Sequence, residues 1–363
     1  MHLLPTQEAI QTKQESQHRH TMTNSQKLDS YPPFVHQSPG IDHCGNPTKN
    51  LQKPESESVP DSDSLPVVDL LSSHPERISE SSREWGMFRL VNHGVESKLL
   101  SKILECAAEV FSLSFESKQV VFDGPIQYFW GSPAISLAGN SQQESPCAQN
   151  LHWLEGFNVP LEKITQFKYE DPLLESFRAL LEEYGNQQSL VAEEIFKTMT
   201  EDLEFSSTKS KSYLSLASGL LRVYRYPWCP LSELRWGIGE HTDSSVLSIL
   251  HQDQVGGLQV CKGSKWLDVQ PSPGALVVNI GDLMQAMSND KYVSVKHRVK
   301  VNKEKDRISI GYFVFPTEDA LIDSSNYRLF TYADFQADRE LDFKTLGTKI
   351  GLPRYKIVPE NSE

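Results

Sequence analysis

The sequence predicts a mixed α and β protein whose double-stranded β-helix (jelly-roll) core is flanked by helices. Three observations support this prediction. From Leu220 onwards, short apolar and β-branched segments are separated by Gly and Pro, which is typical of barrels and double-sheet jelly rolls. Before that point, apolar residues recur at helical spacing. The first 60 residues are polar and poor in aliphatic side chains, so we expect the core to lie entirely after them.

The amino-terminal segment, residues 1–60, is predicted to be a disordered tail. It is rich in Ser, Gln, His, Thr and Pro. Such a segment cannot bury enough apolar surface to offset the entropy lost on ordering. Its histidines lack the spacing of metal ligands, and we interpret them as solvated residues: His2, His18, His20, His36 and His43.

Residues 61–205 are predicted to form a region of helices and short strands. Strands are expected at 65–70 and 87–92, with a helix between them. The segment 96–118 has the apolar spacing of one amphipathic helix. A strong helical period from Asp171 to Met199 predicts either one long helix or two stacked helices.

Residues 123–150 have the composition of a loop and contain the aromatic cluster Tyr128, Phe129 and Trp130. Two interpretations of this cluster stay open. It could be a hydrophobic patch that holds the loop in place, or it could face a substrate.

Residues 206–355 are predicted to form the jelly-roll domain. The carboxy-terminal segment 332–347 has the pattern of a helix that covers the outside of the sheets. The expected strands share apolar, β-branched composition and are 221–226, 245–250, 257–261, 265–269, 275–280, 292–301 and 307–315.

The composition limits the partners and the compartment. The net charge is −13 and the pI is about 5.4, which argues against nucleic acid or an anionic membrane as the main partner. The five cysteines are scattered and show no CxxC pair, so we expect neither disulfides nor a zinc-thiolate site. No run approaches 18 apolar residues, and the amino terminus has neither a secretory pattern nor the arginines of a transit peptide. We therefore expect a monomeric, cytoplasmic protein.

Three residues have the pattern of a metal site. His241 and Asp243 are two residues apart, so in extended chain both can face inward at the start of a strand. His297 lies 54 residues after Asp243, in another expected strand. Two histidines and one carboxylate on one face of an octahedron are the ligand set of non-haem Fe(II) oxygenases, with three positions left open. The alternative, that these are merely polar residues at strand ends, is weakened by the residues described next.

Arg307 and Ser309 follow the distal histidine on one strand and share a face. A buried arginine beside a hydroxyl suits a carboxylate, which can accept two bonds from the guanidinium and one from the hydroxyl. A dicarboxylate with its other end on the metal would fit this arrangement. The order HxD, distal His and RxS therefore indicates a metal site together with a site for a dicarboxylate cosubstrate.

At these residues the sequence resembles the plant 2-oxoglutarate- and Fe(II)-dependent dioxygenases, and among them the gibberellin 2-oxidases. The resemblance covers roughly 65–355. It includes WGMFRLVNHGV and EVFSLSFESK in the first half, and HWLEGFNVP, HTDSSVLSILHQDQVGGLQV, ALVVNIGDLMQAMSNDKYVSVKHRV and SSNYRLFTYADF later on. It implies hydroxylation of a small organic molecule with Fe(II), 2-oxoglutarate and O2, with ascorbate as the reductant. The implied reaction is 2-hydroxylation, and so inactivation, of a gibberellin.

The resemblance also implies roles for individual residues. His241, Asp243 and His297 match the iron ligands, and no catalytic residue beyond this metal centre is implied. Arg307 and Ser309 match the residues that hold the distal carboxylate of 2-oxoglutarate. Tyr226 matches a tyrosine that also contacts 2-oxoglutarate.

The sequence departs from the family pattern at three positions. In the stretch YRYPWC, which resembles the family's NxYPPC, Tyr224 replaces an asparagine and Trp228 replaces a proline. Met287 stands where the family usually has a tryptophan. Tyr224 is bulkier than asparagine near the cosubstrate, so these departures bear on substrate identity more than on the iron chemistry.

The substrate itself would be an apolar fused-ring acid, which calls for apolar surroundings with one or two hydrogen-bond donors. Phe313 and Phe315 lie an even number of residues after Arg307 in the same expected strand, so their side chains should face inward as that of Arg307 does. They either contact the substrate or fill the barrel. Arg222 is two residues from Tyr224 in the same strand, so it should face inward as well, and it is a candidate hydrogen-bond donor to the substrate. Further candidates are Trp130, Met284 and Met287.

Five other polar residues are interpreted as structural or outward-facing. His93 lies in a turn and His251 follows an apolar strand, while Asp282 is expected to cap a turn. Lys296 and Arg298 should point outward by alternation, although one of them could reach a substrate carboxylate.

Three alternatives remain open on the sequence alone. The protein could be a plant dioxygenase that acts on another hormone or on a phenylpropanoid. It could be a relative that uses no 2-oxoglutarate, as the aminocyclopropane carboxylate oxidases do. It could also be a catalytically inactive jelly-roll binding protein.

Overall fold

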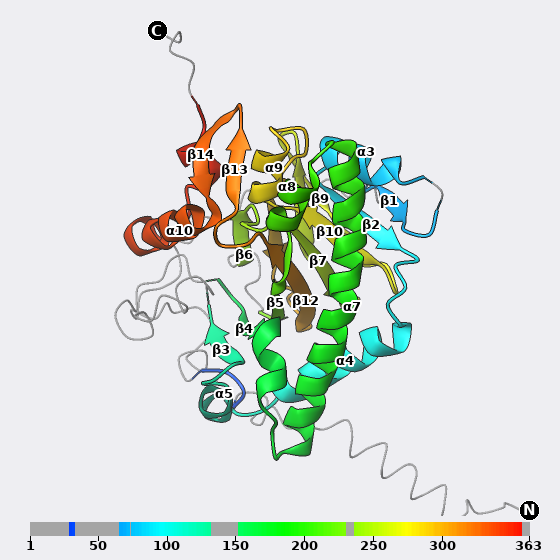
Figure 1. Ribbon diagram of the computed structural model, residues 1–363. Coiled ribbons are helices and arrows are strands. Elements are labelled where there is room, and N and C mark those ends of the chain that lie inside the picture. The colour runs from blue at the N-terminus through cyan, green and yellow to red at the C-terminus, as the bar shows by residue number, and fades with distance from the viewer. Residues whose placement is uncertain (1–28, 33–64, 73, 132–151, 230–235, 358–363) are drawn as a thin grey trace, which may run out of the picture.

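The computed structural model describes residues 29–32, 65–72, 74–131, 152–229 and 236–357. Two sheets lie at the centre, with helices on the outside (Figure 1). The strands of the large sheet, in spatial order, are β1 (Val67–Asp69), β2 (Met87–Val91), β10 (Leu276–Ile280), β7 (Leu247–Gln252), β12 (Arg307–Phe315), β5 (Ser215–Tyr226), β4 (Glu155–Pro160) and β3 (Gln127–Trp130).

The small sheet and a hairpin complete the strands. The small sheet has the order β6 (Trp236–His241), β11 (His297–Lys300), β8 (Leu258–Lys262) and β9 (Lys265–Asp268), and the hairpin consists of β13 (Leu321–Ser324) and β14 (Tyr327–Thr331). The helices are α3 (Glu76–Glu84), α4 (Ser97–Phe111), α5 (Phe115–Val121), α7 (Pro172–Asp202), α8 (Ser207–Tyr213), α9 (Asp282–Met287) and α10 (Tyr332–Leu346), with 3-10 turns η3 (Leu161–Gln166) and η5 (Leu352–Arg354).

The two sheets pack face to face. One buried cluster joins Tyr224 and Tyr226 of β5 to Leu258 and Val260 of β8 and Val299 of β11. Strand pairs within both sheets are antiparallel, except for the parallel pair β1 and β2. Antiparallel strands in two stacked layers form a double-sheet core. The predicted mixed α and β class with a jelly-roll core is confirmed.

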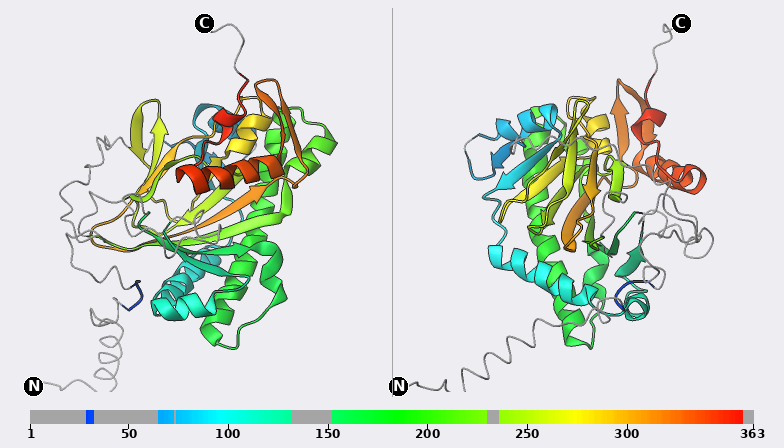
Figure 2. Two further views of the ribbon diagram at one scale, coloured as in Figure 1. Left: turned by 90° about the vertical axis from the view of Figure 1, so that its left-hand side faces the viewer. Right: turned by 180° about the vertical axis from the view of Figure 1, so that it is seen from behind.

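The outer face of the large sheet is covered by helices, as Figures 1 and 2 show for α4 and α7. Side chains of β5 and β12 with outward parity, such as Val223 and Ile310, belong to the same buried cluster as Leu181 and Ile195 of α7. The helical spacing of apolar residues from Asp171 to Met199 predicted one long helix or two stacked helices, and the structure has a single helix of 31 residues, α7. Its first turn is fixed by Asp171, whose carboxylate accepts hydrogen bonds from two backbone N–H groups.

Two local predictions differ from the structure. The segment expected to be one helix at 96–118 is divided into α4 and α5, because Ser114 begins a new helix by accepting a hydrogen bond from the backbone N–H of Ser117. Part of the expected loop at 123–150 is strand β3, which pairs with β4. The rest of that loop from residue 132 lies outside the described residues.

A short piece of the predicted tail is packed against the fold. Ser30 and Tyr31 are buried. The backbone carbonyl of Ser30 accepts a hydrogen bond from Nζ of Lys118 at 2.7 Å, and the guanidinium of Arg225 lies 4.6 Å from the centre of the Tyr31 ring. Composition could not reveal this, because the attraction comes from cations buried elsewhere in the fold. The remainder of residues 1–60 lies outside the described residues.

The carboxy-terminal helix predicted at 332–347 is present as α10. Thr331 and Asp334 form a capping box at its start, and Gly347 ends it with φ 72°, a backbone conformation that glycine adopts without steric cost. Tyr332 stacks on Phe315 at the end of β12, with ring centroids 5.7 Å apart. The helix therefore begins against the end of the large sheet, and Figure 2 shows it running across the side of the molecule.

His251 has the structural role that the sequence predicted. It is buried on β7, and its Nε2 donates a hydrogen bond to the carbonyl of Leu100 at 3.1 Å. Burial lowers the pKa of His251 from 6.5 to about 4, although the Leu100 carbonyl opposes this shift. The unfolded chain therefore binds a proton at a higher pH than the folded chain does, and stability is lost as the pH falls from 6.5 towards 4.

We expect His251→Gln to remove this part of the acid sensitivity. The glutamine side chain can still donate to Leu100 but does not titrate. Between pH 7.5 and 4.5, the wild type should lose about 2 to 3 kcal/mol more unfolding free energy than the variant does. Chemical unfolding at the two pH values measures this difference, and parallel pH dependence of the two proteins would contradict the assignment.

Candidate metal centre and cosubstrate site

The three predicted metal ligands meet at one end of the small sheet. His241 is the last residue of β6 and His297 the first of β11, and these two residues are direct partners in the β6–β11 pairing. Asp243 lies in the turn after β6, where its carbonyl accepts the backbone N–H of Asp282 at 2.8 Å. The sequence placed His241 and Asp243 at the start of a strand. In the structure His241 ends β6 and Asp243 follows it, and β6, a glycine-containing strand without an alternating pattern, was not predicted.

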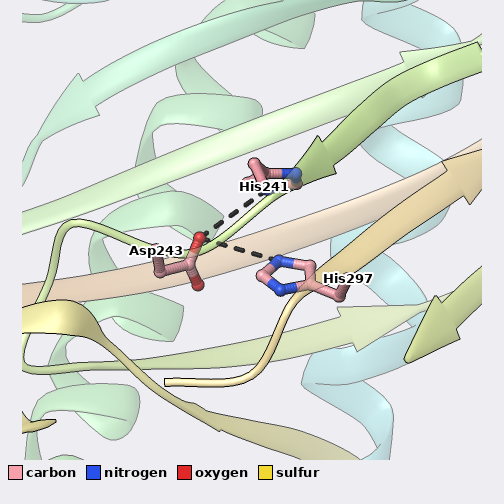
Figure 3. A group of neighbouring side chains, drawn as sticks. All are labelled: His241, Asp243 and His297. Atoms are coloured by element: carbon pink, nitrogen blue, oxygen red, sulfur yellow. Dashed lines mark ion pairs between the residues drawn. The ribbon is translucent and has the colours of Figure 1, made fainter. Parts of the chain in front are cut away.

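The side chains of the three residues point toward one another (Figure 3). The Oδ1 atom of Asp243 is 3.8 Å from Nε2 of His241 and 3.7 Å from Nε2 of His297. One ligand atom from each residue lies within 4.8 Å of the others, so the group could hold a metal ion. Asp243 and His297 are buried and His241 is half-buried.

Backbone carbonyls orient both imidazoles. Nδ1 of His241 lies 2.8 Å from the carbonyl oxygen of Gly239, and Nδ1 of His297 lies 3.2 Å from that of Val295. A carbonyl oxygen only accepts hydrogen bonds, so each Nδ1 carries the proton and each Nε2 presents its lone pair. This second contact fixes the tautomer that a metal requires.

The protonation states also suit a metal. Burial, and then the neighbouring His297, hold the pKa of His241 well below its usual value, so this imidazole is neutral at pH 7. Burial opposes ionisation of Asp243, but the two histidines and two hydrogen bonds keep its pKa below the usual range. Two imidazole nitrogens and one carboxylate oxygen converge, and this is the donor set that Fe(II) takes in the facial triad.

The second oxygen of Asp243 is held by two residues that the sequence analysis missed. Ser248 Oγ and Asn279 Nδ2 each donate to Oδ2 of Asp243 at 2.7 Å. Ser248 and Asn279 are direct partners in the pairing of β7 with β10. These bonds leave Oδ1 free to face the histidines. The sequence does contain a signal for them, because Ser248 and Asn279 are polar residues at inward-facing positions of otherwise apolar strands.

The predicted cosubstrate residues form a second group on β12 and β5. Arg307 is 1% exposed, and it pairs in register with Tyr226. Its guanidinium lies 4.8 Å from the centre of the Tyr226 ring and donates to Oγ of Ser309 at 3.1 Å and to Oε1 of Gln252 at 2.8 Å. No carboxylate among the described residues forms an ion pair with Arg307, and its buried Nε has no hydrogen-bond partner there. This guanidinium therefore lacks the counter-charge that a bound carboxylate would supply.

Tyr226 belongs to the same group. Its hydroxyl forms side-chain hydrogen bonds with Ser309 and Arg307, and burial raises its pKa to about 12, so it is neutral and can donate. The structure thus brings together Arg307, Ser309 and Tyr226, the three residues that the sequence predicted to bind a carboxylate.

The candidate substrate residues lie in different parts of the fold. Arg222 and Phe313 lie together on the inner face, with the guanidinium 5.2 Å from the ring centroid. Phe315, beyond a register shift in β12, packs with the helix-side core instead. Trp130 lies at the end of β3 against Tyr31 and Trp153.

The two methionine candidates lie elsewhere. Met284 and Met287 are buried in α9, and they belong to the large cluster between the sheet and the helices. They do not belong to the cluster between the sheets that contains Tyr224 and Tyr226. This position supports packing as their main role.

The residues interpreted as structural are mostly where the sequence put them. His93 contacts the Gly274 carbonyl through Nε2 at 2.8 Å, and Lys296 points to solvent, where it pairs with Glu240. Arg298 faces away from the metal centre but is buried, because its guanidinium lies 4.2 and 3.8 Å from the rings of Trp236 and Trp266.

Asp282 does more than cap a turn. It is the first residue of α9, and its carboxylate accepts a hydrogen bond from Ser294 and pairs with Lys349 at 2.6 Å. The sequence could not show this, because Lys349 comes from the far end of the chain. Among the described residues, the thiols of Cys106 and Cys261 form no disulfide. No helix in the described ranges is both long and apolar enough to cross a membrane.

Comparisons with known proteins agree with this site. Residues 217–316 match the 2OG-Fe(II) oxygenase superfamily, and residues 65–201 match the family described as non-haem dioxygenase in morphine synthesis N-terminal. Gibberellin 2-beta-dioxygenase 6 of Oryza sativa subsp. japonica is 37% identical over 290 residues, which cover 77% of this chain and 78% of the relative. Gibberellin 2-beta-dioxygenase 8 of Arabidopsis thaliana is 36% identical over 286 residues, with 77% and 80% covered.

A solved structure gives the same fold. The crystal structure of JOX2 in complex with 2OG, Fe, and JA superimposes with a TM-score of 0.67 and 28% identity, covering 81% of this chain and 89% of that chain. The family uses Fe(II) and 2-oxoglutarate, and the donor set described above suits both. The chain therefore belongs to the 2OG-Fe(II) oxygenase superfamily and is a 2-oxoglutarate-dependent dioxygenase.

Proposed function

We propose that this dioxygenase hydroxylates a gibberellin at the 2-position and so inactivates it. The observation that carries the proposal is the similarity to two gibberellin 2-beta-dioxygenases over more than three quarters of the chain. The retained metal and cosubstrate residues argue against an inactive binding protein. Small-molecule substrates and O2 are common to the family.

His241, Asp243 and His297 are the proposed iron ligands. The two neutral Nε2 atoms and Oδ1 of Asp243 approach one point, and the Nδ1 and Oδ2 atoms behind them are already bonded to the protein. Bound Fe(II) would supply coordination sites at which O2 and 2-oxoglutarate react to give succinate, CO2 and a hydroxylated product.

Arg307, Ser309 and Tyr226 are the proposed ligands of the distal carboxylate of 2-oxoglutarate. The guanidinium offers two parallel donors, and the hydroxyls of Ser309 and Tyr226 offer one each. Gln252 holds the guanidinium from the neighbouring strand. These residues bind and orient the cosubstrate, and their burial excludes water from its charged end. The chemistry itself needs no general acid or base from the chain.

Phe313 and Arg222 are proposed to face the substrate, since both project from the inner face of the large sheet. Trp130 at the end of β3 packs against Tyr31 and Trp153, and Phe315 packs with the helix-side core, so neither is assigned to this face. We also propose that the protein works as a monomer in the cytoplasm, with ascorbate as the reductant. The acidic composition and the five scattered cysteines, which include no CxxC pair, support this.

The proposal is tested by incubating the purified protein with Fe(II), 2-oxoglutarate, ascorbate and a panel of gibberellins of both carbon-skeleton sizes. Succinate release is measured and products are identified by mass spectrometry. We expect one or more 2-hydroxylated gibberellins, formed in step with succinate. Succinate formed without a gibberellin product would show that gibberellin is not the substrate, while the protein would still be a 2-oxoglutarate-dependent dioxygenase. The same assay with other hormones and phenylpropanoids then examines the alternative substrates.

Asn279→Ala tests whether the support of Asp243 matters for metal binding. Without the amide, Oδ2 of Asp243 loses one of its two donors, so the carboxylate can rotate away from the histidines. We expect Fe(II) affinity to fall about 10- to 100-fold. Calorimetric titration with Fe(II) under anaerobic conditions measures the change. Asn302→Ala, at an asparagine in the exposed turn before β12, is the matched control. Unchanged affinity in Asn279→Ala would show that Ser248 alone holds Asp243.

A further inference from the structure

Two arginines, Arg222 and Arg339, lie beside the proposed substrate face. Arg222 projects from β5, and Arg339 comes from α10, more than 100 residues later in the chain. Among the described residues, no carboxylate forms an ion pair with either guanidinium. Buried or half-buried cations are normally paired, so this pair is conspicuous.

Arg222 is held in place by uncharged neighbours. Its guanidinium lies over the ring of Phe313, and it forms a side-chain hydrogen bond with the hydroxyl of Tyr224. Its Nε atom is buried and has no hydrogen-bond partner among the described residues. A guanidinium has five N–H donors, so most of this group's donors remain available to a ligand.

Arg339 on α10 lies within electrostatic range of Arg222. Burial, and then the positive charge of Arg222, lower the pKa of Arg339, while Tyr332 and Glu340 oppose this shift. Tyr332 on the same helix is within the electrostatic range of both arginines and stacks on Phe315 of β12. The start of α10 is thereby fixed to the sheet, and two like charges are held together. An anion between them would relieve this repulsion.

The position along the sheet separates this pair from the cosubstrate residues. Arg222 and Tyr226 share the inner face of β5 and are four residues apart, which corresponds to about 13 Å in a strand. Arg222 is opposite Gly311, and Tyr226 is opposite Arg307. Tyr224 lies between them and is close enough to Asp243 for that carboxylate to influence its pKa. Arg222 and Arg307 therefore lie at opposite ends of this line, four residues apart in register.

We propose that Arg222 and Arg339 together bind the carboxylate of the organic substrate, and that Tyr224 positions Arg222 for this contact. This rests on the proposed function and deepens it, because it assigns the substrate class as a monocarboxylic acid whose apolar body reaches toward the metal. Arg307 receives the carboxylate of 2-oxoglutarate and the arginine pair receives that of the substrate. Tyr224, which replaces the asparagine of the family pattern, gains a role through its hydroxyl.

The experiment compares gibberellins with their methyl esters, which keep the carbon skeleton and lose the negative charge. Wild type should use each acid with a KM at least about 30-fold below that of its ester, as expected for loss of a charge-assisted contact. Arg222→Gln and Arg339→Gln should each raise the KM of the acid by about 30-fold and reduce the preference for the acid. Arg222→Lys should retain part of the preference for the acid over its ester, because lysine keeps the positive charge but lacks the two parallel N–H donors of a guanidinium.

Two controls separate substrate binding from damage to the fold. Arg77→Gln changes an arginine that is exposed on α3. It should leave the KM values for the acid, the ester and 2-oxoglutarate within about twofold of those of wild type. Substrate-independent succinate formation by the arginine variants should keep the 2-oxoglutarate KM of wild type. The comparison of acid and ester in wild type needs no variant, so it decides the proposal even if a variant does not fold.

Anaerobic calorimetry separates this proposal from the proposed function. Gibberellins, jasmonic acid and indole-3-acetic acid are titrated, each beside its methyl ester, into the protein loaded with Fe(II) and 2-oxoglutarate. If gibberellins are not hydroxylated but another acid binds better than its ester, the assigned hormone is wrong and the arginine pair stands. If no acid binds better than its ester, or if the arginine variants keep the preference, the proposal is overturned.

Discussion

Asp243→Ala is expected to lower substrate-dependent succinate formation by more than about 100-fold. Even the loss of a residue that only supports a metal ligand costs 10- to 100-fold, and Asp243 is the sole carboxylate of the triad. Without it, two neutral imidazoles remain, and neither balances the charge of Fe(II). Iron content after anaerobic loading and desalting, measured together with succinate, shows whether activity is lost through the metal.

Glu240→Ala is the matched control for this experiment. Glu240 is three residues away, is exposed and pairs with Lys296 on the outside of the small sheet. Its removal should leave iron content and turnover near the values of wild type. Circular dichroism should show both variants folded. Full iron retention with full activity in Asp243→Ala would refute the proposed ligand set.

Arg307→Leu is expected to raise the KM for 2-oxoglutarate by about 100-fold or more. A fully desolvated contact between guanidinium and carboxylate is worth several kcal/mol, and the variant would leave the cosubstrate carboxylate facing apolar atoms. Arg307→Lys should give an intermediate value, because a lysine offers a point charge without parallel donors. The measurement is succinate formation as a function of 2-oxoglutarate, supported by calorimetric binding to the Fe(II)-loaded protein.

Lys303→Gln serves as the control, since Lys303 is an exposed cation in the turn just before β12. Ser309→Ala should show a smaller loss than Arg307→Leu, of about tenfold, as expected for one hydrogen bond to a charged group. An unchanged KM in Arg307→Leu would mean that the cosubstrate binds elsewhere. Iron content should stay at the wild-type value in all three variants, which distinguishes them from Asp243→Ala.

The metal and cosubstrate residues could be predicted because their spacing is short and their chemistry is distinctive. His241 and Asp243 are two residues apart, and so are Arg307 and Ser309. In extended backbone, such pairs share a face whatever the rest of the fold does. The strand pattern after Leu220 and the helical period after Asp171 were equally local, and both elements are present.

The residues that support and extend the site could not be predicted in this way. Ser248 and Asn279 look like ordinary polar residues in apolar strands until β7 pairs with β10 and turns both toward Asp243. Strand β6 lacks an alternating pattern and is a strand because β11 pairs with it. Arg339 lies in a helix whose sequence shows only that it is helical.

The sequence by itself determined helix α7, the strands with an apolar or alternating pattern, the metal and cosubstrate residues and the family resemblance, because these depend on spacing over a few residues. Only the tertiary structure decided which polar groups hold Asp243, how Tyr31 packs onto Arg225 and how Arg339 comes to lie beside Arg222. Apart from Ser248, which is five residues from Asp243, these contacts join residues between about 30 and 200 positions apart. Their geometry is set by the pairing and packing of whole strands and helices, and local periodicity carries no information about that.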